Sequence, residues 1–292
     1  METSHKNDMN GLINQMQMIK FQSVFMAALD LLKKQPVLLI GLFLAPMLIN
    51  AVIQNFIMMP ISLAMASSGL IGVMIVSVLF GVLAAVIGLI GTGLLLRAAS
   101  QVFDGKKVDL KALASFVEKH FVDAIRLAIK LFIFTGGWLM IAYMAVVALL
   151  LPIAPALSAT LGLLSPIALI VYVIVFFKKI VNASLSYAIF WSAEAPLSPD
   201  GSLKKSLELA EGLSMTIFGN YLLISIIGMV ISMVLMPVLL AIFAVTGDFG
   251  IQLSGAVIGG LLGTFYVLFQ YCLKGQIEKF RAGGHHVTAH SA

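Results

Sequence analysis

The sequence predicts an all-α membrane protein with six transmembrane helices, and composition and charge distribution lead to this fold class. The mean hydropathy is +1.07. Hydrophobic residues make up 61% of the chain and charged residues only 11%, whereas soluble domains carry about a quarter charged residues. All 18 Lys and Arg residues fall into four clusters, which are 1–34, 97–130, 178–205 and 274–281. The class of ordinary soluble domains is therefore excluded.

Three long stretches separate the basic clusters. In 35–96, 131–177 and 212–273, Asp248 is the only Asp, Glu, Lys, Arg or His. One crossing of a bilayer takes roughly 20 apolar residues, so each stretch can cross twice. We therefore expect three transmembrane hairpins with every base on one side. Because Lys and Arg are retained in the cytoplasm during insertion, both termini should be cytoplasmic (N-in and C-in).

The first hairpin should be formed by spans at about 36–56 and 70–96. Pro36 suits a first helical turn, and Pro46 should kink the helix interior. The uncharged segment 57–69 is expected to lie along the outer interface.

The second hairpin should be formed by spans at about 130–151 and 156–177, joined by the PIAP turn at 152–155. Pro166 is expected to bend the fourth span. In an alternative arrangement, the fourth helix continues through Lys178 and Lys179 to Trp191. Burying each Lys in the membrane would cost about 2.5–3.5 kcal/mol, so we expect this pair at the interface.

The third hairpin should be formed by spans at about 216–244 and 251–273, with Asp248 in the turn between them. Residues 1–281 then make a single six-helix membrane domain. The remaining residues, 282–292, are expected to be a disordered cytoplasmic tail.

An amphipathic segment precedes each hairpin, which predicts a cytoplasmic interfacial helix before each one. Asp109 should cap the second of these helices, and Ser198-Pro199 should start the third. Pairs three or four residues apart should form ion pairs. They are Lys119 with Asp123, Asp123 with Arg126, and Lys204 with Glu208. The apolar faces are Phe21, Val24, Phe25, Ala28, Leu29 and Leu32 in the first helix, Leu113, Val117, Phe121 and Ile125 in the second, and Leu203, Leu207 and Ala210 in the third.

Small residues recur at intervals of four in two spans, a spacing that lets helices in a membrane approach closely. They are Ala84, Gly88 and Thr92 in the second span, and Gly255, Gly259 and Gly263 in the sixth. Two interpretations are open: packing between spans of one chain, and a seam between copies in a homo-oligomer.

A polar face is predicted in the first span, where Asn50 and Gln54 lie one turn apart with Asn55 beside them. Amides inside a membrane are costly unless they are paired. They can bond neighbouring helices, lie near the outer interface, or mark a substrate path. The predicted spans carry no charged residue at mid-depth, which argues against an ion-driven transporter.

The residues of the chain suggest no catalytic, cofactor or metal site. The sequence GLIGTG at 88–93 resembles a nucleotide loop but lies inside a predicted span. His285, His286 and His290 are near no Cys or carboxylate that would complete a metal site. The net charge of +5 is explained by retention of bases in the cytoplasm rather than by nucleic-acid binding.

The stretch 187–222, YAIFWSAEAPLSPDGSLKKSLELAEGLSMTIFGNYL, resembles a pattern in uncharacterised bacterial inner-membrane proteins. It is similar to the YciC-like proteins and to the membrane domain attached to some glycerophosphoryl diester phosphodiesterases. The segment 28–44, ALDLLKKQPVLLIGLFL, is similar to the first helix of that superfamily. The resemblance implies six transmembrane helices, a bacterial cytoplasmic membrane, and an acidic residue, here Glu194, near the end of the fourth span. It implies no catalytic residues.

We expect a non-enzymatic membrane protein with a structural or accessory role in envelope or lipid handling. Its partners should be membrane lipids with anionic headgroups. A second copy of the chain and another membrane protein are the further partners that the sequence leaves open. The alternative is a carrier or channel for a lipid-like or uncharged solute, which a cavity between the first and fourth spans would favour. The bases expected at the headgroups are Lys33, Lys34, Lys106, Lys107, Lys178, Lys179, Lys204 and Lys205.

Overall fold

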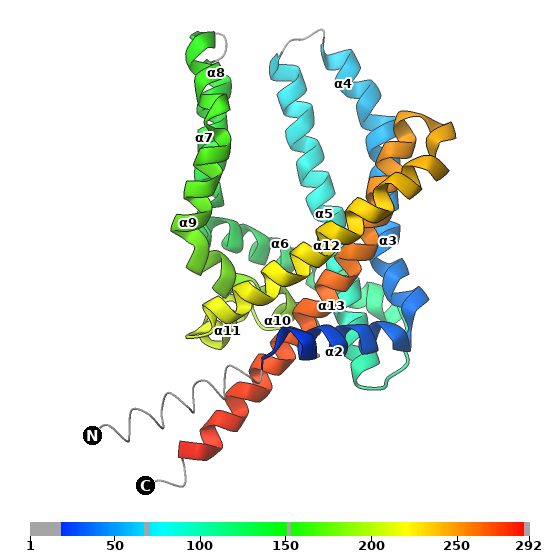
Figure 1. The fold of residues 1–292 in the computed structure, drawn as a ribbon, viewed down its shortest axis with the longest axis vertical. Helices are drawn as coiled ribbons and strands as arrows, with labels where there is room; N and C mark the ends of the chain where they lie inside the picture. The colour runs from blue at the N-terminus through cyan, green and yellow to red at the C-terminus, as the bar shows by residue number, and fades with distance from the viewer. Residues whose placement is uncertain (1–18, 67–69, 151–152, 289–292) are drawn as a thin grey trace, which may run out of the picture.

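The computed structural model describes residues 19–66, 70–150 and 153–288 of the chain, and in these ranges the fold is helical without strands (Figure 1). Five helices are long and apolar enough to cross a membrane, and a sixth is added if one bent pair counts as a single span. An all-α fold with five or six such helices is confirmed.

The helices follow one another with short breaks. Their bounds are α2 (Phe21–Lys34), α3 (Pro36–Ile53), the π-helix η1 (Gln54–Met58), α4 (Met59–Ala66), α5 (Leu70–Phe103), α6 (Leu110–Phe134), α7 (Gly137–Leu150), α8 (Pro155–Leu163), α9 (Ser165–Ala183), α10 (Ser186–Ser192), α11 (Pro199–Ala210), α12 (Ser214–Ile242), the 3₁₀ turn η2 (Ala244–Thr246) and α13 (Asp248–Thr288).

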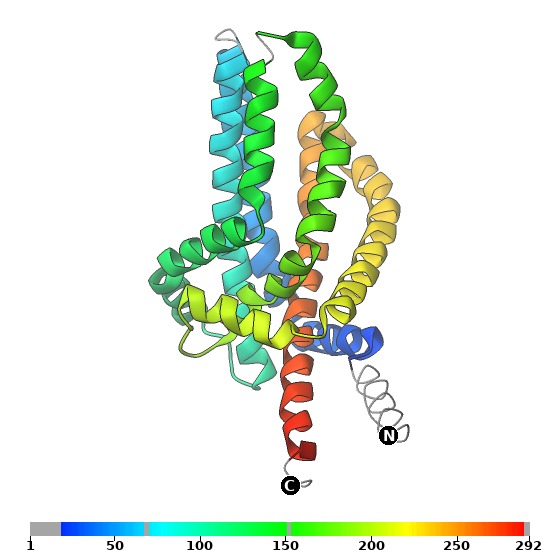
Figure 2. The ribbon, with the colours of Figure 1, turned by 90° about the vertical axis from the view of Figure 1, so that its left-hand side faces the viewer.

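Helix α13 is the central helix of the molecule. It packs against α3, α2, α12 and α5. In its most apolar window 44% of the residues are buried, compared with 6% in α12. Figures 1 and 2 show α5, α7, α9 and α13 running along the molecule, whereas α2, α6 and α11 run across it at one end. We call this end, with α10 and the ends of α5 and α13, the basic end.

The largest fully buried side chains belong mainly to helices of the basic end. Trp191 and Phe190 of α10 are 0% and 1% exposed. Trp191 fits against α5 because residue 93 is glycine: a Cβ there would lie 2.9 Å from the indole ring. Long apolar faces of α7, α9 and α12 remain exposed, as expected for helices that face lipid.

The first span does not end at residue 56. The helix continues through η1 and α4, so that residues 36–65 form one candidate span. The expectation that 57–69 lies along the outer interface stays a prediction, and its described part, 57–66, continues the helix of the first span. Pro60 explains the π-helix, because its ring clashes with the carbonyl four residues earlier and π turns relieve such clashes.

The third span bends sharply. Helix α6 continues to Phe134, four residues past the predicted start at 130, and the axis then turns by 71° into α7. Gly136 ends α6 with a φ of 75°, which glycine adopts without strain. Its Cβ would also lie 2.5 Å from Phe176, so no side chain fits there.

The fourth span is broken at Leu164 rather than bent at Pro166, which lies in the first turn of α9. Helix α9 does not end at 177; it continues through Lys178 and Lys179 to Ala183, and α10 follows after one turn. The observed helices therefore follow the alternative arrangement, in which the fourth helix continues through the two lysines toward Trp191. The ammonium group of Lys179 lies 5.5 Å from the ring centres of Phe134 and Phe176.

The predicted caps are present in the described chain, and so are two of the three predicted ion pairs, the exception being Lys119 with Asp123. The carboxylate of Asp109 accepts hydrogen bonds from the backbone of Lys111 and Ala112, and the hydroxyl of Ser198 accepts one from Gly201. Arg126 pairs with Asp123 at 3.0 Å. Lys204 and Glu208 are 3.9 Å apart, at the outer limit of an ion pair.

The buried faces of the three helices before the predicted hairpins differ in part from the predicted faces. Val24 and Ala28 are buried in α2, and Leu113 and Val117 in α6, as the spacing indicates. In α11 the buried face is shifted by one residue. Its buried residues are Ser202, Ser206, Leu209 and Ala210, whereas Leu203 and Leu207 are only partly buried.

The shift in α11 has a polar cause. The hydroxyl of Ser206 donates to the carbonyl of Asn182 at 2.6 Å, and that of Ser214 donates to the Asn182 side chain at 2.6 Å.

At the other end of the chain, α13 continues to Thr288, past the start of the predicted tail at 282. Residues 289–292 lie outside the described ranges.

Candidate functional site

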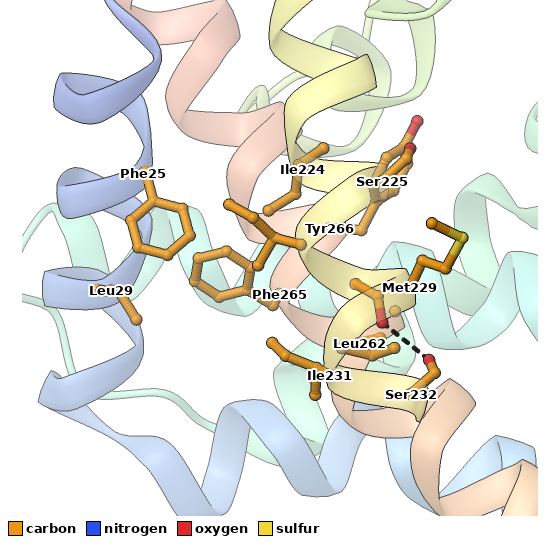
Figure 3. A pocket seen from close by; sticks show the side chains of 13 residues that line it. Phe25, Leu29, Ile224, Ser225, Met229, Ile231, Ser232, Leu262, Phe265 and Tyr266 are labelled. Atoms are coloured by element: carbon orange, nitrogen blue, oxygen red, sulfur yellow. Dashed lines mark hydrogen bonds between the residues drawn. The ribbon is translucent and has the colours of Figure 1, made fainter. Parts of the chain in front are cut away.

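An apolar groove lies between α12 and α13 and is closed at one side by α2 (Figure 3). Its volume is about 510 Å³, within the range of about 300–1,000 Å³ typical of small-molecule sites. The lining residues are Phe25 and Leu29 of α2, Ile224, Ser225, Ile227, Gly228, Met229, Ile231 and Ser232 of α12, and Leu262, Gly263, Phe265 and Tyr266 of α13.

Stacked aromatic rings form the wall between α2 and α13. Phe25 meets Phe265 edge-to-face with ring centres 5.1 Å apart, and Phe21 lies 5.4 Å from Phe25 and 5.6 Å from Phe269. Such pairs contribute about 0.5–1.5 kcal/mol beyond their buried area. They hold α2 against α13 and so fix one wall of the groove.

The groove offers few polar groups. The hydroxyl of Ser232 donates to the Gly228 carbonyl of its own helix at 2.8 Å. On the open side, Met229 is 53% exposed and Ile231 is 39% exposed. An apolar groove with exposed apolar side chains on its open side suits a hydrocarbon chain rather than a polar substrate.

Glycine makes room for the groove. A Cβ at Gly263 would lie 2.3 Å from Phe43 of α3, so α3 and α13 approach closely on the opposite side. At Gly228, on α12, the nearest described atom to a Cβ would be 3.8 Å away, on Leu262. Helix α12 therefore contributes a flat surface to the groove.

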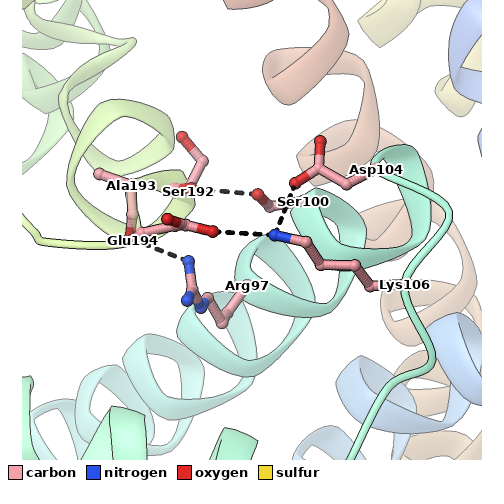
Figure 4. A network of polar contacts seen from close by, with 7 residues as sticks. All are labelled: Arg97, Ser100, Asp104, Lys106, Ser192, Ala193 and Glu194. Carbon is pink, nitrogen blue, oxygen red and sulfur yellow. Dashed lines mark hydrogen bonds and ion pairs between the residues drawn. The ribbon is translucent and has the colours of Figure 1, made fainter.

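A polar network at the basic end fixes the last turn of α10 (Figure 4), and we call it the α10 clamp. Arg97 donates to the carbonyl of Ala193 at 3.0 Å, and the Ser100 hydroxyl donates to the Ser192 carbonyl at 3.1 Å. The Lys106 ammonium lies 2.8 Å from the Glu194 carboxylate. The clamp joins α5 and the loop after it to α10.

The electrostatics of the clamp indicate a structural role. The hydrogen bond from Lys106 and its positive charge, with Arg97 adding to them, lower the pKa of Glu194 below its usual value. The same hydrogen bond raises the pKa of Lys106. Both groups are therefore charged at neutral pH, unlike a proton-transferring pair, whose pKa values lie near the working pH.

The predicted polar residues of the first span lie at the break between α3 and α4. Asn50 belongs to the last turn of α3, and Gln54 and Asn55 to η1. Gln54 lines a second pocket together with Gln252 of α13, Ser62 of α4 and Ser77 of α5. Gln252 was not among the residues that the sequence suggested, although it is the first amide in the last apolar segment.

The small residues predicted for helix packing divide into two groups. In the described part of the chain, a Cβ at Gly263 would meet Phe43, whereas one at Gly88, Gly255 or Gly259 would meet nothing within 4 Å. Ala84 lines the second pocket, and Thr92 is partly buried. Close contacts within the chain occur instead at Gly91, Gly93 and Gly260, which meet Pro46, Trp191 and Leu44.

The bases expected at the headgroups all lie at the basic end or on the adjoining end of α9. Lys33 pairs with Asp30 at 3.3 Å, and Lys205 pairs with Glu278 at 3.5 Å. Lys34, Lys107 and Lys178 are exposed. Lys204, Lys205 and Arg281 line a surface pocket of about 540 Å³ with Glu208.

Neither cavity lies between the first and fourth spans, where a transport path was considered. The apolar groove lies between the fifth and sixth spans, and the second pocket between the first, second and sixth.

The described residues contain no group of three His, Cys, Asp or Glu placed to hold a metal ion. His290 and the side chains of His285 and His286 lie outside the described part.

Comparison of the chain with protein-family models, with curated proteins and with solved structures found no match. What the site and the fold establish is therefore the structural class: an all-helical chain whose five or six long apolar helices are consistent with a multi-pass membrane protein.

Proposed function

We propose that this protein is a non-catalytic, lipid-binding protein of a bacterial cytoplasmic membrane, with an accessory role in envelope or lipid handling. The apolar groove between α2, α12 and α13 carries the proposal, because its lining suits a lipid acyl chain. The bacterial membrane is supported by the resemblance of 187–222 to YciC-like proteins.

The arrangement of bases supports the same role. In the described ranges, every Lys and Arg belongs to the basic end or to the end of α9, and α2 brings Lys33 and Lys34 within two turns of groove residue Leu29. Each base near a membrane surface attracts anionic headgroups by about 1 kcal/mol. In our proposal the groove holds the chain of a lipid whose anionic headgroup lies among these bases.

The proposed topology has three transmembrane hairpins, each preceded by a helix that lies at the cytoplasmic interface. Supporting it, α2, α6 and α11 run across the molecule at the basic end (Figures 1 and 2). The apolar residues that these helices bury face α13, α5, α10 and α9, while their charged residues are exposed except for Asp123 and Lys130 of α6, which are partly buried.

Native mass spectrometry of the protein extracted with its lipids tests the function, and Gly228→Leu is the informative variant. The new side chain would extend from α12 into the groove without a close contact at its Cβ. Leu also favours a helix over Gly by about 1 kcal/mol, so folding should survive. We expect the unmodified chain to retain lipid and Gly228→Leu to retain several-fold less.

Gly219→Leu is the matched control. It makes the same change on the same helix, outside the groove, where a Cβ would meet nothing within 4 Å in the described chain. It should retain lipid like the unmodified protein. Equal retention by all three proteins would rule out the groove as the lipid site.

A further inference from the structure

The second pocket combines amide and hydroxyl groups inside an otherwise apolar part of the molecule, and we call it the amide pocket. Its volume is about 360 Å³. Gln54, Ser62, Ser77 and Gln252 supply its polar groups, and the rest of its lining is apolar. The four residues come from η1, α4, α5 and α13, so the pocket exists only in the folded bundle.

A π turn places Gln54 in this pocket. The backbone N–H of Met59 donates to the carbonyl of Gln54, five residues earlier, instead of to the residue four earlier. Single π turns inside helices occur frequently at functional sites, because the extra residue redirects the side chains of one turn. Phe56 of the same turn meets Phe249 of α13 with ring centres 5.2 Å apart, which holds the two helices together beside the pocket.

The amides are incompletely paired. The Oε1 atom of Gln252 is buried and accepts no hydrogen bond from the described residues, and the same holds for Oδ1 of Asn50, one turn before Gln54. Buried polar atoms in proteins nearly always have a partner. Gln252 lines the pocket and is only partly buried, so a change of its side-chain rotamer can bring this acceptor to a hydrogen-bond donor in the pocket.

The ligand of such a pocket should be uncharged. The stretch 35–96, which supplies three of the four polar residues, contains no Asp, Glu, Lys, Arg or His, and in 212–273 Asp248 at the start of α13 is the only one. An anionic ligand would therefore lack a counter-ion in these segments, which is costly inside a membrane, and a cationic ligand would have Asp248 alone. Amides and hydroxyls together suit a group that both donates and accepts hydrogen bonds.

We propose that the amide pocket binds an uncharged hydroxyl-bearing group of the glycerol type, either as part of a neutral lipid or as a free polyol. The pocket is separate from the apolar groove: its residue Gln252 lies near the start of α13, whereas the groove residues Leu262 and Tyr266 lie further along the same helix. The molecule thus has two binding sites of opposite chemistry.

The test uses the full chain in nanodiscs of phosphatidylethanolamine and phosphatidylglycerol with two probes. Dioleoylglycerol added to the disc is detected by native mass spectrometry, and glycerol added to the solution is detected by saturation-transfer NMR. Gln252→Met removes the unpaired acceptor at nearly constant volume. One lost hydrogen bond of about 1 kcal/mol should weaken the affinity about fivefold, which lowers the occupancy by the same factor at probe concentrations well below saturation.

Gln101→Met is the matched control, because Gln101 also has a buried Oε1 without a partner in the described chain but lies at the basic end. It should bind the probes like the unmodified protein. Binding of dioleoylglycerol alone identifies a lipid ligand, and binding of glycerol identifies a free polyol.

Three results would overturn the proposal. The first is that neither probe binds, and the second is that Gln252→Met and Gln101→Met bind equally. The third is that Gly228→Leu, and not Gln252→Met, lowers the occupancy of dioleoylglycerol, because the probe would then occupy the apolar groove. If the apolar groove proves not to bind lipid, the proposal for the amide pocket is tested separately, since the two sites share no residue.

Discussion

Single glycines decide where the helices of this protein approach one another. At Gly93, Gly260 and Gly263 a neighbouring side chain occupies the space of the missing Cβ: Trp191, Leu44 and Phe43, respectively. At Gly88 the same space is open in the described structure. The recurrence of small residues every four positions does not separate these cases, because it states only where close approach is allowed.

Substitution of Gly93 by Ala should destabilise the protein. The added methyl group would lie 2.9 Å from the fully buried indole of Trp191, and overpacking of this kind typically costs about 1–3 kcal/mol. The free energy of unfolding can be measured by SDS titration of the detergent-solubilised protein.

The control for this prediction is Gly88→Ala on the same helix. With open space around its Cβ, it should be neutral or stabilise the helix by up to about 1 kcal/mol. A Gly93→Ala variant as stable as Gly88→Ala would contradict the described fit of Trp191 against α5.

Among the elements, α10 is the one that the periodicity of the sequence does not reveal. It is short, nearly all of its residues are buried, and it follows two lysines that suggest a helix end. Its place depends on the α10 clamp, in which Arg97, Ser100 and Lys106 bind the groups at its carboxyl end. These partners are about 90 residues away in the sequence, so no local pattern reports them.

The contribution of Glu194 to stability should depend on pH. Because Lys106 lowers the pKa of Glu194 in the folded protein, its stabilisation is fully present above the ordinary value of 4.5. It is then lost as the pH falls through the lower folded value. The difference in unfolding free energy between the unmodified protein and Glu194→Gln should therefore be constant near neutral pH and vanish on acidification.

Glu118→Gln, at an exposed carboxylate of α6, serves as the control for the same measurement. Because pairs at exposed positions contribute little, we expect a small effect at Glu194. A difference that grows on acidification would show that Glu194 is not held in its charged form by the clamp.

At the scale of the whole molecule, the bases define one end. A reporter domain inserted after Lys107 should be cytoplasmic, and one inserted after Ser68 should be external. The reason is that Lys and Arg near span ends are retained on the cytoplasmic side. Compartment-specific reporter activity in bacterial cells checks this, and the opposite pattern would invert the proposed topology.

Both binding proposals join residues that the sequence keeps apart. The apolar groove combines residues near 25, 228 and 263, and the amide pocket combines residues near 54, 77 and 252. The sequence pointed to Asn50, Gln54 and Asn55, since amides are unusual in an apolar segment. It could not point to Gln252 as their neighbour, because the contact depends on how α13 packs against α3.

The sequence by itself determined the class of this protein, the approximate places of its apolar helices, and the caps at Asp109 and Ser198. These follow from local properties: hydropathy over about 20 residues, charge at the ends of spans, and side chains that bond their own backbone. Only the tertiary structure decided the π turn beside Pro60, the bend at Gly136, the central position of α13, the apolar groove and the amide pocket. Each of these depends on which side chains from distant segments compete for the same space.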